Sequence, residues 1–113
     1  MNVTNLSELS ELDAAIAESR EHPVLLFKHS RTCGISHAAL DELRAHMGRL
    51  GGAATYKLIT VQSHRVISDE AAARLGVRHE TPQAILIRGG RAVWKASHFR
   101  ITADQLDAAL GQA

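Results

Sequence analysis

Apolar residues recur three and four positions apart in several segments of the chain, which is the spacing of one face of an α-helix. This spacing predicts helices over residues 7–20, 34–50, 68–76 and from Thr102 onward. The first helix is expected to begin with a capping box formed by Ser10 and Asp13 and to end near Pro23. Gly51–Gly52 and Gly76 are expected to end the two middle helices, because glycine readily follows a last helical turn.

Short stretches between these helices predict β-strands. Residues 24–27 form a continuous apolar run, as expected for a strand that is covered on both faces. Further strands are predicted over residues 55–61, 83–87 and 91–97. Because Gly89–Gly90 lies between the last two strands, they are expected to form a β-hairpin with a two-residue turn.

The order of these elements is helix, then strand, helix and strand, then helix, then two strands and a helix. A parallel strand–helix–strand unit with a right-handed crossover, followed by a hairpin and a closing helix, predicts a thioredoxin-like α/β fold. We expect a four-stranded mixed sheet in the order 2-1-3-4, flanked by helices, with an N-terminal helix before the first strand. The 113 residues, without repeats or linkers, are expected to form a single domain spanning 1–113.

The composition argues against a nucleic-acid or membrane protein. Thirteen Lys and Arg against 12 Asp and Glu, scattered along the chain, form no basic stripe, and 4% aromatic residues leave few stacking platforms for bases. No run approaches the roughly 18 apolar residues of a membrane span. The N-terminus carries no basic region followed by an apolar run, so we expect a cytoplasmic protein.

The chain contains one cysteine, Cys33, so no internal disulfide can form and any redox chemistry must run between molecules. A free cysteine is often an inert core residue. Cys33, however, follows a strand and precedes a helix, where unpaired N–H groups and the helix dipole favour a thiolate. At such positions the pKa of a thiol falls from about 8.5 to between roughly 3.5 and 7.5. Lys28, Arg31 and His37 would act in the same direction, and we interpret Cys33 as reactive.

The dipeptide Thr81–Pro82 lies between the helix that ends near Gly76 and the strand that begins at Gln83. A proline that opens a strand usually follows a trans peptide bond. In thioredoxin-like folds, however, the proline at this place is cis and lies against the active cysteine. The backbone of the preceding residue is then free to pair with an extended thiol or peptide ligand. We therefore predict a cis Thr81–Pro82 bond beside Cys33.

Several motifs together resemble one family, and they extend along essentially the whole chain. They are residues 27–30, Thr32–Cys33, Ile35–Ser36, residues 77–85, residues 96–98 and Ile101–Thr102. These motifs are similar to those of the monothiol bacilliredoxins, thioredoxin-like proteins first labelled YtxJ or bacillithiol system proteins. Family members commonly carry Thr-Cys-Pro-Ile-Ser, whereas this chain has Gly34 in the place of the proline. Because glycine leaves the first helical turn freer than proline, this departure bears most on the pKa of Cys33.

The resemblance implies a monothiol thiol-disulfide oxidoreductase that removes bacillithiol, the glutathione substitute of some bacteria, from protein mixed disulfides. Cys33 would attack the bacillithiol sulfur, release the target protein as a thiol and become bacillithiolated. Ser36 stands in the place of the second cysteine of a CxxC motif, so no resolving cysteine is present. A second bacillithiol would therefore release the symmetric disulfide, which a separate flavin-dependent reductase would recycle.

Bacillithiol carries carboxylates on its malate portion, so its binding site should offer cations or N–H donors. Lys28, Arg31, Arg78 and His79 flank the two segments that are expected to converge at Cys33. Lys28 has an alternative, since a lysine that ends a strand can extend its charged end into solvent. The predicted contact set for bacillithiol is Lys28, Arg31, Thr32, Gly34, Arg78, His79, Thr81 and Pro82.

Seven histidines raise the question of a metal site. His29 and His37 each lie four residues from Cys33, but the paired ligand spacing of a structural zinc site is missing. We therefore expect no bound metal. His37 would tune the thiolate or be solvated, and His79 and His98 would form structural hydrogen bonds near the proline. An iron–sulfur cluster shared by two Cys33 residues across a dimer is an open alternative, as are a non-catalytic metal carrier and a redox-sensing adaptor.

Overall fold

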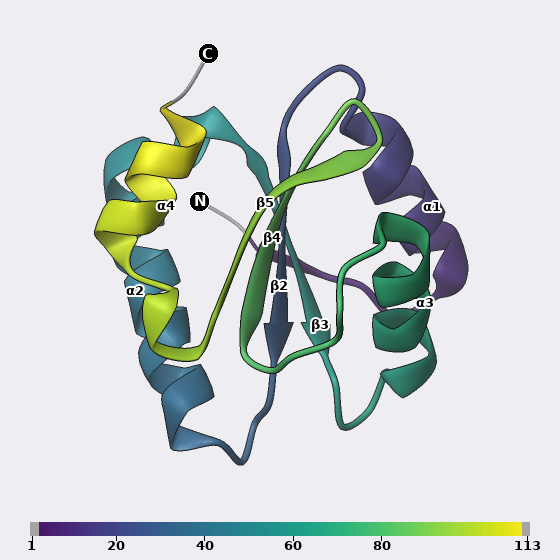
Figure 1. Ribbon diagram of the computed structural model, residues 1–113, viewed down its shortest axis with the longest axis horizontal. Coiled ribbons are helices and arrows are strands. Elements are labelled where there is room, and N and C mark those ends of the chain that lie inside the picture. The colour runs from purple at the N-terminus through teal and green to yellow at the C-terminus, as the bar shows by residue number, and fades with distance from the viewer. Residues whose placement is uncertain (1–2, 112–113) are drawn as a thin grey trace.

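The computed structural model describes residues 3–111 and shows a five-stranded β-sheet between two pairs of helices (Figure 1). The strands are β1 (Val3–Asn5), β2 (Val24–His29), β3 (Thr55–Thr60), β4 (Gln83–Arg88) and β5 (Arg91–Ser97). They lie in the order β1-β3-β2-β4-β5. β1, β3 and β2 are parallel, β4 runs antiparallel to β2, and β5 runs antiparallel to β4. The carboxyl ends of β2, β3 and β5 and the amino end of β4 therefore share one end of the sheet.

The sheet contains a strand beyond the four that were predicted in the order 2-1-3-4. Val3–Asn5 pairs with β3 from Tyr56 to Leu58, and the N–H of Leu6 continues this pairing to the carbonyl of Leu58 at 2.8 Å. The predicted N-terminal helix is present at Leu9–Glu18, but the prediction that it precedes the first strand is wrong, because Val3–Asn5 comes before it. β1 escaped prediction because a short, largely polar edge strand is held by backbone hydrogen bonds and shows no apolar periodicity. The four predicted strands occupy the remaining positions, β3-β2-β4-β5.

Helices and 3-10 turns make up the rest of the regular structure within residues 3–111. They are α1 (Leu9–Glu18), α2 (Gly34–Leu50), η1 (Gly51–Ala53), α3 (Arg65–Leu75), η2 (His98–Arg100) and α4 (Ala103–Leu110). The predicted bounds of α2 are confirmed, whereas α3 begins before the predicted Ser68. At α1, the carboxylate of Glu11 accepts the N–H groups of Ser7 and Glu8, so the predicted Ser10–Asp13 capping box is wrong. None of these helices is long and apolar enough to cross a membrane.

β2 is buried on both faces, as its continuous apolar sequence predicts. α2 and α4 cover one face of the sheet, and α1 and α3 cover the other (Figure 1). Phe27 belongs to the same core as Leu43 of α2, and Leu26 to the same core as Leu12 of α1. Each fully buried side chain of this kind stabilises the fold by roughly 1.5–3 kcal/mol. The two cores together fix the position at which the chain leaves β2 toward Cys33.

The β4–β5 hairpin turns at Gly89–Gly90, as predicted. Both glycines have positive φ angles, 59° and 77°, which residues with a Cβ atom rarely adopt. The N–H of Gly89 donates to the carbonyl of Ser19 at 2.7 Å, and the N–H of Gly90 donates to the Ser19 hydroxyl at 2.9 Å. The turn is thereby tied to the end of α1, at the end of the sheet opposite Cys33.

Candidate active site

Cys33 lies where the chain passes from β2 into α2, as the sequence predicts. It is the N-terminal capping residue of α2, with extended backbone angles (φ −106°, ψ 121°) and no capping hydrogen bond from its side chain. The thiol is free and the residue is partly exposed. The carbonyl of Cys33 accepts the N–H of His37 at 3.2 Å, which starts the helical hydrogen-bond pattern. An anionic sulfur here would lie at the positive end of the helix dipole, near N–H groups that have no partner within the helix.

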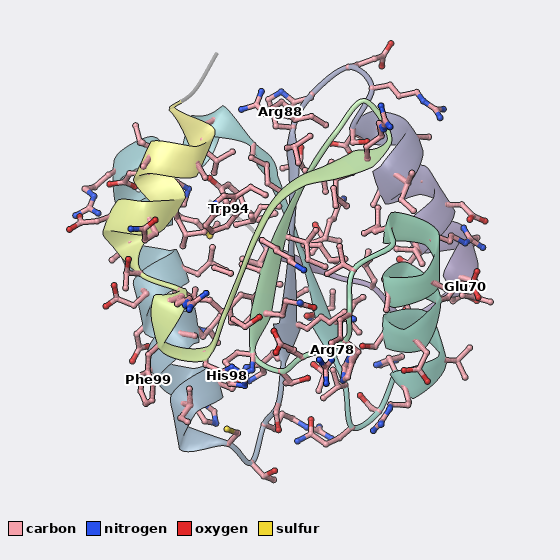
Figure 2. The ribbon with its side chains drawn as sticks, viewed as in Figure 1. Glu70, Arg78, Arg88, Trp94, His98 and Phe99 are labelled. Atoms are coloured by element: carbon pink, nitrogen blue, oxygen red, sulfur yellow. The ribbon has the colours of Figure 1, made fainter. Side chains whose placement is uncertain are left out.

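Two further segments reach the same end of the sheet. The Thr81–Pro82 peptide bond directly precedes β4 and is cis, the isomer predicted from its place in the fold. The carbonyl of Pro82 accepts the N–H of His98 at 3.1 Å, so the residues after β5 are tied to the proline. Figure 2 shows Arg78, His98 and Phe99 toward this lower end of the molecule. Residues from three distant parts of the chain therefore meet where β2 ends.

Gln62, in the connection between β3 and α3, holds the loop between β2 and α2. Its side-chain oxygen accepts the N–H of Arg31 at 3.2 Å. Its side-chain nitrogen donates to the hydroxyls of Ser30 at 2.7 Å and Thr32 at 3.2 Å. One side chain thus fixes three consecutive residues immediately before Cys33. Sequence reasoning missed Gln62, because a single polar residue after a strand carries no local signal of partners so distant in the chain.

Ser36, at the place of the second cysteine of a CxxC motif, is fully buried. Its hydroxyl oxygen accepts the N–H of Ser30 at 2.9 Å and lies 2.7 Å from Nδ1 of His29. Burial, and then the charge of His37, lowers the pKa of His29. His37 donates from Nε2 to the carbonyl of Arg31 at 2.7 Å, so these side chains brace the loop from the α2 side. Within residues 3–111, no group of three histidine, cysteine, aspartate or glutamate side chains could hold a metal ion.

Lys28, His79 and Thr81 form a hydrogen-bonded chain on the α1 and α3 side of the sheet. Lys28 is 0% exposed; its ammonium group donates to the carbonyl of Ser68 at 3.0 Å and lies 3.1 Å from Nδ1 of His79. Burial lowers the pKa of Lys28 to about 8, against the opposing charge of Asp69. Burial also lowers the pKa of His79, and the charge of Lys28 adds to this effect. Nε2 of His79 lies 3.3 Å from the Thr81 hydroxyl.

An open hollow of about 480 Å³ lies along β5 and the residues that follow it. It is lined by Glu80, Lys95, Ala96, Ser97, His98, Phe99 and Arg100. A second hollow of about 210 Å³ lies between His98, Phe99 and the first turns of α2 at Ile35. Phe99 is 76% exposed and lines both hollows. The end of the molecule that carries Cys33, called the site end below, therefore presents a large apolar side chain to solvent. This side chain follows His98, whose N–H donates a hydrogen bond to the carbonyl of Pro82.

A protein-family model described as monothiol bacilliredoxin BrxC matches residues 4–106. The chain belongs to the monothiol bacilliredoxin family. The resemblance seen in the sequence motifs is thereby confirmed. Membership of this family implies a link to bacillithiol and to bacillithiolated proteins.

Solved structures agree with this assignment. One, described as a proposed oxidoreductase with a thioredoxin fold, has 30% sequence identity and a TM-score of 0.85, with 97% of this chain and 94% of that chain covered. Malassezia sympodialis thioredoxin has 15% identity and a TM-score of 0.77, over 98% of this chain and 90% of that chain. Fasciola hepatica thioredoxin has 18% identity and a TM-score of 0.73, over 96% of each chain. The two thioredoxins show the fold alone, which confirms the predicted thioredoxin-like fold; family and fold together indicate a thiol redox role.

The predicted contact residues of this bacilliredoxin differ in their exposure. Arg31, Thr32, Gly34 and Arg78 are exposed, His79 and Thr81 are partly exposed, and Lys28 and Pro82 are buried. A Cβ atom added at Gly34 would meet no atom within 4 Å, so the space beside this residue is open at the Cβ position. The complete burial of Lys28 does not fit direct contact with a ligand that arrives from solvent.

Proposed function

We propose that Cys33 removes bacillithiol from mixed disulfides between bacillithiol and target proteins. One observation supports this most strongly: the single cysteine of a monothiol bacilliredoxin is a free, partly exposed thiol at the amino end of α2. Thiol–disulfide exchange requires a thiolate, and the helix dipole favours that form at this position.

In the first step, the Cys33 thiolate attacks the bacillithiol sulfur of the mixed disulfide. A sulfur–sulfur bond forms between Cys33 and bacillithiol while the bond between bacillithiol and the target breaks. The electron pair of the broken bond leaves with the target sulfur, which takes up a proton and becomes a thiol. The target protein is thereby reduced, and Cys33 is oxidised to a mixed disulfide with bacillithiol.

A second bacillithiol completes the cycle, because Ser36 offers no thiol. The thiolate of this second molecule attacks the bacillithiol sulfur that is bound to Cys33. The symmetric bacillithiol disulfide forms, and the Cys33 thiolate is released. A separate flavin-dependent reductase then supplies the two electrons that return the disulfide to bacillithiol.

Exposed cations at the site end suit the carboxylates of bacillithiol. Arg31 and Arg78 extend from the two segments that meet beside Cys33, and a guanidinium group can bind a carboxylate through two hydrogen bonds. The remaining contacts are assigned to the exposed Thr32 and Gly34 and to the partly exposed Thr81; Pro82, also in the predicted set, is buried. Lys28 acts from inside the fold, since its hydrogen bonds go to protein groups, and the partly exposed His79 links it to Thr81.

The target protein is expected to dock on the exposed Phe99. This side chain lines both hollows beside His98, whose N–H donates to the carbonyl of Pro82, and a protein surface docked there would bury its apolar area. Phe99→Ala should therefore slow the reaction with a bacillithiolated protein while the reaction with bacillithiol disulfide keeps its rate.

The first test compares two small disulfides. Reduced protein is incubated with bacillithiol disulfide and, separately, with glutathione disulfide, and the adduct mass at Cys33 is followed over time. We expect faster adduct formation with bacillithiol disulfide and none in the Cys33→Ser variant. Equal and poor modification by both disulfides would overturn the bacillithiol assignment.

The second test measures turnover. With a bacillithiolated protein, bacillithiol and its reductase, each enzyme molecule should release many target thiols, and Cys33→Ser should release none. Modification of Cys33 that stops after one equivalent would favour a redox-sensing adaptor. A visible absorption band after anaerobic purification would favour a cluster carrier instead.

A further inference from the structure

We infer that Lys28 and His79 are positioning residues that set the Thr81 hydroxyl to donate a hydrogen bond to the small-thiol half of the mixed disulfide at Cys33. This inference rests on the proposed function, because it takes Cys33 as the residue on which that mixed disulfide forms. It assigns a task to a fully buried lysine that the exchange steps themselves do not use.

Hydrogen-bond chemistry fixes the direction of the chain. The Lys28 ammonium group can only donate, so Nδ1 of His79, 3.1 Å away, must accept. The Ser68 hydroxyl, 3.3 Å from the same nitrogen, is a second donor. A neutral imidazole then carries its proton on Nε2, which lies 3.3 Å from the hydroxyl oxygen of Thr81. Because burial and the charge of Lys28 lower the pKa of His79, the ring is neutral at neutral pH.

Thr81 is left with an unused donor. Its oxygen accepts from His79, so its own O–H proton is free, and within residues 3–111 the hydroxyl has no other hydrogen-bond partner. The residue is partly exposed. Thr81 stands two residues before Gln83, which pairs with Lys28 in the last register position between β4 and β2. Thr81 thus lies at the same end of the sheet as the carboxyl end of β2, from which the chain leads to Cys33.

Charges on neighbouring elements act on the same ring. Arg65 of α3 and Lys28 of β2 disfavour the protonated form of His79, whereas Asp69 of α3 and Glu80 favour it. Burial is the largest effect, so the pKa of His79 is lowered on balance. The ammonium group of Lys28 is thus the buried charge that holds the neutral ring in one tautomer.

Variants at Thr81 and Lys28 test this chain. Thr81→Val keeps the shape of the side chain but removes the hydroxyl, and should slow Cys33 adduct formation with bacillithiol disulfide about three- to tenfold, the usual effect of one hydrogen bond. Thr81→Ser restores the hydroxyl and should recover the rate to within about twofold. Lys28→Met removes the donor to Nδ1 of His79 and should cause a loss of the same order as Thr81→Val.

The His79 ring supplies a readout that a merely structural role would not link to the rate. In nitrogen-15-labelled wild-type protein at neutral pH, NMR should show a neutral ring with its proton on Nε2. In Lys28→Met the ring should titrate at a higher pH and populate both tautomers. His46→Gln is the matched control. His46, like Lys28, is fully buried, but its ring is hydrogen-bonded to Asp107 of α4, on the opposite face of the sheet. It should leave both the adduct rate and the His79 tautomer unchanged.

A wild-type ring protonated on Nδ1, or a Thr81→Val variant with the wild-type rate, would overturn the inference. If Lys28→Met does not fold, the pair Thr81→Val and Thr81→Ser still decides it. Failure of the proposed function would look different. Wild-type protein would then react no faster with bacillithiol disulfide than with glutathione disulfide, while the tautomer and the Thr81→Val effect on glutathione disulfide would remain measurable.

Discussion

Two hydrogen-bond networks, each centred on a histidine, lie on opposite faces of the sheet. On the α2 and α4 side, His46 is fully buried, with Nδ1 2.6 Å from the Asp107 carboxylate and Nε2 2.7 Å from the Tyr56 hydroxyl. On the α1 and α3 side, His79 joins the buried Lys28 to the segment that precedes β4. Both rings are held through both nitrogens, yet the first network ties α2 to β3 and α4, and the second leads to the end of the sheet that carries the cysteine.

The networks differ in where they end. The Tyr56 hydroxyl also lies 3.3 Å from the carbonyl of Leu50, and Asp107 pairs with Arg49 at 2.7 Å, so these groups are occupied within the fold. The other chain ends at the Thr81 hydroxyl, which retains a donor. A closed polar network contributes stability and rigidity, whereas one with an unused donor at a site can act on a ligand. The comparison predicts that the first network governs stability and the second governs reactivity.

Removal of His46 should cause the largest loss of stability. His46→Ala deletes a buried ring and leaves the Tyr56 hydroxyl and the Asp107 carboxylate without their partner, which should lower the free energy of unfolding by about 3 kcal/mol. Urea unfolding measures this change. The rate of adduct formation at Cys33 should stay within about twofold of wild type, as expected for two independent sites. A variant that kept its stability but lost reactivity would reverse the comparison.

Lys28→Met should change how stability depends on pH. The pKa of Lys28 in the folded protein is about 8, below its ordinary value of 10.5. Between these values the unfolded chain binds more protons, so this lysine makes the free energy of unfolding rise with pH; below pH 8 the cost of burying the charge is fully present. Between pH 8 and 10.5, the free energy of unfolding of wild type should therefore rise relative to that of Lys28→Met. Urea titrations at several pH values measure it, and a constant difference would contradict a charged, buried Lys28.

Much of the fold could be predicted because it depends on local apolar patterns. β2 carries a continuous run of apolar residues and α2 a periodic one. Gly89 and Gly90 supply the positive φ angles that the hairpin turn requires. β1 could not be predicted, since Val3–Asn5 is held by pairing with a strand far along the chain. The start of α1 was misplaced because several acidic and hydroxyl residues fit a capping pattern, and only the helix register decides among them.

The candidate site divides in the same way. The position of Cys33 before α2 and that of Pro82 before β4 follow from the order of neighbouring elements. The support given by Gln62 and the burial of Lys28 depend on contacts across the sequence, and a lysine near a strand end carries no sign of its exposure. The bacillithiol contacts remain a prediction, since they need a ligand to test them.

Tyr56→Phe tests one link of the stability network. The variant loses the hydroxyl between His46 and Leu50, and the free energy of unfolding should fall by about 1 kcal/mol. Burial and the charge of Asp107 raise the pKa of Tyr56 to about 12, above its ordinary value of 10.0. This phenol therefore stabilises the fold below pH 10, and the contribution is lost as pH rises toward 12. Alkaline unfolding curves should show a smaller loss in Tyr56→Phe than in wild type; equal losses would contradict a buried neutral phenol.

The smallest effect is expected from the exposed end of the same network. Arg49 reaches Asp107 at 2.7 Å, but its side chain is 51% exposed, so water and salt screen the pair. Arg49→Gln should shift the thermal midpoint by no more than about 2 °C, and added salt should reduce that shift further. Differential scanning calorimetry at low and high salt measures both. A loss of stability as large as that of His46→Ala would mean that the surface ion pair, rather than the buried imidazole, holds α4 against α2. The stability of this network would then depend on an exposed pair, and not on the fact that all its buried groups are hydrogen-bonded within the fold.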